Sequence, residues 1–210
     1  MMARDVKILL GGIILASVLW FWMFSPWTAD LVRNFWAWMT AAGIILASYS
    51  FLLAPAWKED IHLSLSEILL GIGLAALFWG VFWVGDKLSQ LLFDFARPQV
   101  NLIYGLKDGA NPLSVGLLLF FLIGPAEEIF WRGFIEKSLI SRLGRWKGFI
   151  IATLLYSFVH VWSGNFMLIM AALIIGALWG FIYMMWPRHL GAVIISHSLW
   201  DLAAFILFPI

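Results

Sequence analysis

Long apolar runs separated by short polar segments dominate this chain. About seven of them, each roughly 17 to 25 residues long, could cross about 30 Å of hydrocarbon as helices. We expect these runs at residues 7–24, 35–55, 65–85, 112–138, 148–163, 167–186 and 190–208. The pattern predicts an all-α fold, a polytopic transmembrane helix bundle that forms a single domain over residues 1–210.

The longest polar interruption spans Asp86 to Asn111. Its leucines and phenylalanines form a partial apolar face, so we expect an interfacial helix that ends at Pro98. The turn-forming residues between Gly105 and Pro112 predict a loop that leads into the fourth run.

Composition supports a membrane protein, because 63% of the residues are hydrophobic, 12% are charged and the mean hydropathy is +0.96. Fourteen tryptophans suit rings that lie near lipid headgroups. A net charge of +1 gives no support to a nucleic-acid partner. The absence of cysteine excludes disulfides, thiolate nucleophiles and cysteine metal sites.

Lysine and arginine are distributed unequally between the two sides of the predicted bundle. One side would hold eight of them, Arg4, Lys7, Lys58, Lys137, Arg142, Arg145, Lys147 and Arg188. The other would hold four, Arg33, Lys87, Arg97 and Lys107. The positive-inside rule then predicts a multi-pass protein of the cell membrane with a cytoplasmic N-terminus and an external C-terminus.

The fourth run contains two adjacent carboxylates and an arginine, Glu127, Glu128 and Arg132. A charge in hydrocarbon costs several kcal/mol, so such residues face a protein interior and are functional candidates. Residues four apart share a helix face, whereas residues five apart lie about 140° apart. We therefore expect Glu128 to pair with Arg132 and Glu127 to face another partner. A buried ion-pair network without chemistry is the alternative.

Two further runs carry polar residues at the same helical spacing. Tyr156 and His160 share a face in the fifth run, and His197 and Asp201 share one in the seventh. At about 1.5 Å per residue, Glu127, His160, His197 and Asp201 lie roughly 11 to 18 Å from the cytoplasmic ends of their runs. This common depth predicts one polar intramembrane site, although core packing remains the alternative for Tyr156.

These residue types suit peptide hydrolysis without a covalent intermediate. A carboxylate can take a proton from water, a histidine can orient that water, and further donors can stabilise an oxyanion. The sequence contains neither a Gly-x-Ser-x-Gly nucleophile elbow nor a His-Glu-x-x-His zinc pair. We expect no metal and no cofactor. Zinc stays open as a second reading, because Glu127, His160, His197 and Asp201 are acceptable ligands by atom type.

The three motifs resemble those of the CPBP family, the CAAX-processing and bacteriocin-processing intramembrane endopeptidases. The matching positions are Glu127-Glu128-x-x-x-Arg132-Gly133, Tyr156-x-x-x-His160 and His197-x-x-x-Asp201. They cover the C-terminal half, where residues 112–208 would form the catalytic core helices.

The resemblance implies a glutamic-type intramembrane endopeptidase. In it, Glu127 and His160 would activate water, and His197 and Asp201 would support the oxyanion. Glu128, Arg132 and Tyr156 would be supporting residues. Tyr156 stands where phenylalanine is common in the family. Asp201 stands where some members have Asn, and an ionised Asp accepts but does not donate a hydrogen bond.

The resemblance also implies a membrane-associated protein or peptide as substrate, and the lipid bilayer as surroundings. Prenylated C-terminal tails, leader peptides and the sorting tails of myxosortase-type relatives all fit, and no residue chooses among them or indicates an oligomeric state. The alternative from another class is a non-enzymatic polytopic protein, either a proton or solute pathway or an inactive protease-like scaffold.

Overall fold

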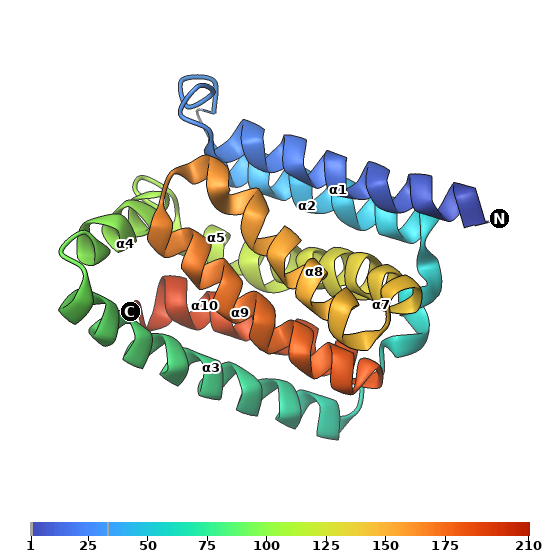
Figure 1. The fold of residues 1–210 in the computed structure, drawn as a ribbon. Helices are drawn as coiled ribbons and strands as arrows, with labels where there is room; N and C mark the ends of the chain where they lie inside the picture. Colours follow the sequence, from blue (N-terminus) through green and yellow to red (C-terminus); the bar gives the residue numbers. More distant parts are fainter. Residues whose placement is uncertain (1, 33) are drawn as a thin grey trace.

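A computed structural model describes residues 2–32 and 34–210, with about 85% of the chain in helices and no strand among the described residues. The chain crosses the bundle seven times, so its two ends lie at opposite ends of the molecule (Figure 1). The crossings are α1 (Met2–Phe24), α2 (Phe35–Leu53), α3 (Leu65–Leu92), the continuous α5 to α7 (Pro112–Leu143), α8 (Arg145–Phe158), α9 (Phe166–Met185) and α10 (Leu190–Leu202). The predicted all-α bundle is confirmed.

Six helices in the described part of the chain are long and apolar enough to cross a membrane. The predicted run at 148–163 is the exception. There α8 has 14 residues and continues as the 3₁₀ segment η4 (Val159–Ser163). The last crossing ends in a π-helical segment, η6 (Ala203–Leu207). The molecule is thus a multi-pass membrane protein whose fifth crossing is a short helix extended by a 3₁₀ turn.

The polar interruption differs from its prediction. Helix α3 continues to Leu92, and a separate helix, α4 (Ala96–Gly105), follows it. Pro98 lies in the first turn of α4, so the expectation that it ends a helix is wrong. Proline is tolerated in a first turn because the backbone N–H that it lacks has no partner there.

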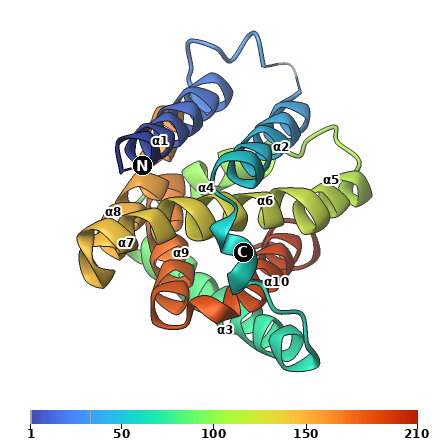
Figure 2. The same ribbon diagram turned by 90° about the vertical axis from the view of Figure 1, so that its right-hand side faces the viewer.

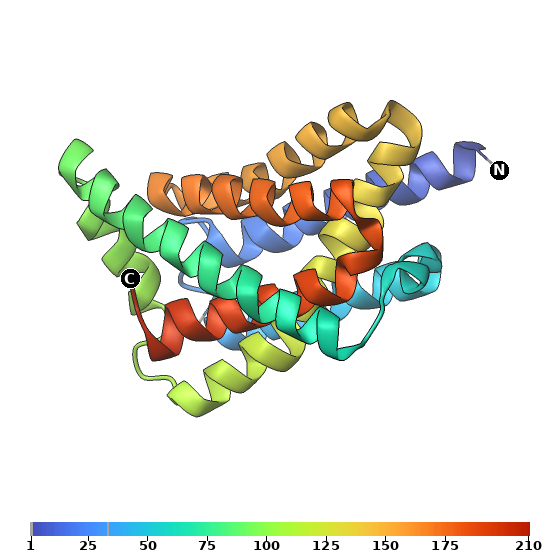
Figure 3. The same cartoon turned by 90° about the horizontal axis from the view of Figure 1, so that it is seen from below.

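The central helix of the bundle is the α5–α7 crossing. Viewed end-on, α6 lies in the middle, with α1 and α2 on one side and α3 and α10 on the other (Figure 2). Seen from below, α3 runs across the face of α10 (Figure 3). The polar residues of the fourth run are therefore surrounded by protein.

The positively charged residues predicted for the two sides fall on loops and helix ends at opposite ends of the bundle, as the seven crossings require. Arg33 lies outside the described residues. Which end faces the cytoplasm stays a prediction.

Candidate active site

The central helix changes its winding around the two glutamates. Helix α6 (Gly124–Glu128) lies between two π-helical segments, η2 (Leu119–Ile123) and η3 (Ile129–Glu136). Pro125 lacks the backbone N–H that an α-helix would bond one turn back, and a wider turn precedes it. The helix stays continuous, and Glu127 and Glu128 lie on the short α-helical turn between the two wider segments.

Glu128 and Arg132 form the ion pair expected from their spacing. Arg132 donates to Glu128 Oε1 at 2.8 Å, and both side chains are buried. Arg132 also donates to the carbonyl of Gly176 on α9 at 3.2 Å, and its guanidinium lies 4.7 Å from the ring centroid of Tyr156. The pair ties the central helix to two neighbouring crossings.

Glu128 has a second partner that the sequence did not indicate. His197 Nδ1 lies 2.6 Å from the same Glu128 oxygen, and His197 Nε2 lies 3.4 Å from Asp201 Oδ2. Trp179 stacks on the imidazole, with ring centroids 3.9 Å apart. His197 is thus held between two carboxylates and against one aromatic face. The spacing argument found Asp201 but missed Trp179 and the contact with Glu128, which join residues far apart in sequence.

Tyr156 links Glu127 to His160. Its hydroxyl donates to Glu127 Oε2 at 3.1 Å, and its backbone carbonyl lies 2.8 Å from His160 Nδ1. Because a carbonyl only accepts, Nδ1 carries the proton in this contact. Glu127 is 6% exposed and His160 is 7% exposed, so both are held within the bundle.

The other nitrogen of His160 is bonded to a residue of the first helix. The indole N–H of Trp20 donates to His160 Nε2 at 3.1 Å, and Trp20 is 1% exposed. Trp20 lies 140 positions before His160. It stands in an apolar run with Trp22, in a chain of fourteen tryptophans, so the sequence carries no signal of this contact.

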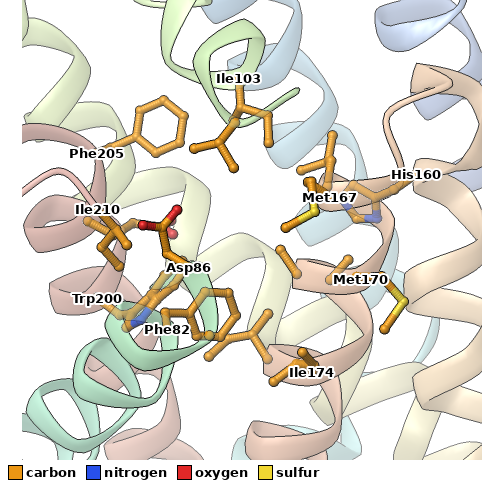
Figure 4. A pocket seen from close by; sticks show the side chains of 18 of the residues that line it. Phe82, Asp86, Ile103, His160, Met167, Met170, Ile174, Trp200, Phe205 and Ile210 are labelled. Atoms are coloured by element: carbon orange, nitrogen blue, oxygen red, sulfur yellow. The ribbon is translucent and has the colours of Figure 1, made fainter. Parts of the chain in front are cut away.

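The four candidate side chains share one cavity of about 720 Å³. Its polar wall contains Glu127, His160, His197 and Asp201, and most of its remaining lining is apolar. Figure 4 shows His160 at one side of the cavity and Asp86 and Trp200 at the other. Their common depth, estimated from the sequence, corresponds to this shared cavity.

Asp86 lines the same cavity from α3. It accepts from Gln90 Nε2 on the same helix at 2.5 Å, and Arg97 Nη1 lies 3.7 Å from its other oxygen. The contact with Arg97 joins α3 to α4. The sequence predicted that the third run ends at residue 85, so Asp86 was assigned to an interfacial segment. In the structure it lies on α3, which continues to Leu92.

The positions of the acidic and histidine side chains also bear on whether the site could hold a metal ion. Within residues 2–32 and 34–210, no three His, Asp or Glu side chains lie together in a group that could hold a metal ion. A site without metal or cofactor stays a prediction.

One comparison with known proteins gives a match. Residues 109–203 match the family model described as "Rce1-like: Type II CAAX prenyl endopeptidase Rce1-like". Searches of curated proteins and of solved structures gave no match. The matched segment contains all three motifs and begins within three residues of the predicted start of the core helices. The match confirms the recognition of the CPBP family and supports a protease.

Proposed function

We propose, from the premise that this chain belongs to the CPBP family through residues 109–203, that it is a glutamic-type intramembrane endopeptidase. Its substrate would be the membrane-associated tail or leader of another protein, and a prenylated CAAX tail is the first candidate from the family description. The observation that carries the proposal is the single cavity lined by Glu127, His160, His197 and Asp201.

Glu127 is the proposed general base. It lines the cavity, and Arg132 is paired with Glu128, which leaves Glu127 without that cation. A water held between Glu127 and His160 attacks the carbonyl carbon of the scissile bond and gives its proton to Glu127. When the tetrahedral intermediate collapses, the C–N bond breaks and Glu127 returns the proton to the leaving amine.

His197 is the proposed oxyanion donor. Its Nδ1–H is committed to Glu128, so the donating atom must be Nε2. Asp201 lies 3.4 Å from that nitrogen and stabilises a proton there. Asp201 then orients His197 and supports its charge, while the donor to the oxyanion is the histidine.

The supporting residues hold the water-activating pair and the oxyanion donor in place. Glu128 and Arg132 hold His197 and the central helix, and Tyr156 holds Glu127 and His160. Such support matters because a hydrolytic site needs its reacting groups within a few tenths of an ångström of a productive arrangement. The proposed site needs no metal, and the protein would act in the cell membrane.

The test is a comparison of the membrane proteome of cells that carry the unchanged protein, Glu127→Gln or His160→Ala. We expect at least one membrane-associated protein to keep an uncut tail or leader in both variants, because each lacks a group that activates water. General acid–base groups typically contribute about 10²- to 10⁴-fold to a rate. Mass spectrometry of protein termini measures the effect.

Glu136→Gln is the matched control. Glu136 lies on the same crossing, is 1% exposed and lies outside the cavity wall described above. The same substitution there should leave processing unchanged. Normal processing in both Glu127→Gln and His160→Ala, with the protein present in the membrane, contradicts the proposal and favours a non-enzymatic pathway or scaffold.

A further inference from the structure

Both ring nitrogens of His160 are already bonded. Nδ1 donates to the carbonyl of Tyr156 at 2.8 Å, and Nε2 accepts from the indole of Trp20 at 3.1 Å. A neutral imidazole has one donor and one acceptor in its plane, so these two contacts use its full capacity. The nitrogen that would accept a hydrogen bond from water is the one that Trp20 occupies.

The indole N–H makes the same kind of bond that a water O–H would make to this nitrogen. It satisfies Nε2 while no water is there, since a buried acceptor without a partner costs free energy. The two partners exclude each other, because the lone pair of Nε2 accepts one strong hydrogen bond in the ring plane.

Trp20 belongs to a helix on the outside of the bundle. One face of α1 is buried, and this face carries Leu9, Ala16, Trp20 and Met23. Its opposite face is exposed toward the surroundings and carries Val6, Leu10, Ile14 and Val18. Phe24, one turn beyond Trp20, lines the cavity and lies 6.0 Å from the His160 ring centroid. The cavity wall therefore includes α1 at a point one turn from Trp20.

We infer that Trp20 is a positioning residue that caps His160 in the resting site, and that its indole N–H must be exchanged for water before hydrolysis. This inference rests on the proposed function, because it assigns a role to the water that Glu127 deprotonates. Trp20 acts through His160 and does not touch the reacting atoms.

The test is Trp20→Phe, which keeps an aromatic ring and removes the N–H. A hydrogen bond of ordinary net strength is worth about 0.5 to 1.5 kcal/mol, so its loss should raise the cleavage rate about 2- to 10-fold. The substrate is the tail identified by the proteome comparison. Trp22→Phe on the same helix controls for the loss of an indole. Trp57→Phe, at a position 3% exposed and outside the cavity wall, controls for lost volume in the core. The indole nitrogen of Trp22 has no hydrogen-bond partner among the described residues.

A second readout does not depend on activity. Imidazole ¹⁵N spectra of protein labelled at its four histidines report what bonds to His160 Nε2, with His160→Ala used for assignment. The unchanged protein should show a contact from an indole proton, and Trp20→Phe should show one from water. This measurement on the unchanged protein remains decisive if the variant does not fold.

The inference is overturned if Trp20→Phe folds and cleaves at or below the rate of the unchanged protein while both controls match it. It is also overturned if the spectra show water on Nε2 in the unchanged protein. The proposed function fails separately, through normal processing by both Glu127→Gln and His160→Ala, and the spectra then still report on the bond between Trp20 and His160.

Discussion

Tyr156 holds two candidate catalytic side chains through different atoms, its hydroxyl for Glu127 and its backbone carbonyl for His160. Only the first contact depends on the side chain. The ring itself packs against Trp131 and His160, with centroids 5.4 and 5.3 Å away. Replacing Tyr156 by phenylalanine thus removes one oxygen atom and keeps the packing of the ring.

Tyr156→Phe should fold normally and cleave about 2- to 10-fold more slowly than the unchanged protein. The reason is that Glu127 loses a hydrogen bond worth about 0.5 to 1.5 kcal/mol in its positioning. Initial cleavage rates and the melting temperature in detergent measure the two effects. Tyr49→Phe is the control, because Tyr49 bonds the carbonyl of Ile8 at 2.7 Å, away from the cavity. Equal rates for Tyr156→Phe and the unchanged protein would contradict the proposed role of the hydroxyl.

Contacts between residues on one helix were predictable from the sequence, and contacts between helices were not. A spacing of four residues fixes a shared face, which is why the pair of Glu128 with Arg132 could be expected. Trp20 and Trp179 reach their histidines from other helices, and apolar runs carry no information on which helices become neighbours. A tryptophan in such a run resembles any packing residue until its N–H is seen to have a partner.

At the scale of elements, α6 and α10 approach closely at Gly124. A Cβ at this position would lie 2.9 Å from Ser198 Oγ and 3.1 Å from Ser198 Cα. Ser198 follows His197 directly, so the contact sets the distance between the helix of Glu127 and the helix of His197. Small residues allow such approaches in membrane bundles.

Gly124→Ala should lower the free energy of unfolding by about 1 to 3 kcal/mol, because overpacking forces side chains or backbone to shift. It should also reduce cleavage, since α10 moves relative to α6. Unfolding in mixed detergent measures the first effect. Gly80→Ala is the control, because a Cβ there has no other atom within 4 Å in the described structure. Similar stability in the two variants would show that the contact at Gly124 is loose.

Helix positions were predictable because a membrane crossing needs a minimum apolar length, but helix ends were less so. The polar interruption that starts at Asp86 predicted a helix end at residue 85, although α3 continues to Leu92. There, charged and polar side chains lie at a helix end and bond one another, as Gln90 does with Asp86. Pro98 was assigned to the wrong end of its helix because proline is compatible with a first turn as well as with a stop.

At the scale of the whole molecule, the chain crosses the bundle seven times, so we predict that its two ends lie on opposite sides of the membrane. Because the chain has no cysteine, single cysteines can report this topology. In intact cells, Asp108→Cys should react with a membrane-impermeant thiol reagent, and Lys147→Cys should react only after the membrane is opened. Both positions are exposed. The reverse pattern would place the N-terminus outside, and labelling of both from one side would contradict a membrane crossing by the central helix between them.

The fold class and the residues of the polar wall could be expected from hydropathy and from three short motifs. The arrangement of crossings around α6 could not, because it depends on packing between distant segments. The cavity itself is a property of that arrangement.

The bond from Trp20 has a consequence for divergence among related chains. Trp20 lies well before residues 109–203, the segment that identifies the family. On our inference, a change at this one position alters the hydrolytic rate while every motif residue stays the same. Two relatives with identical motifs can then differ in turnover, and the residue at the position of Trp20 is the first place to look for the difference.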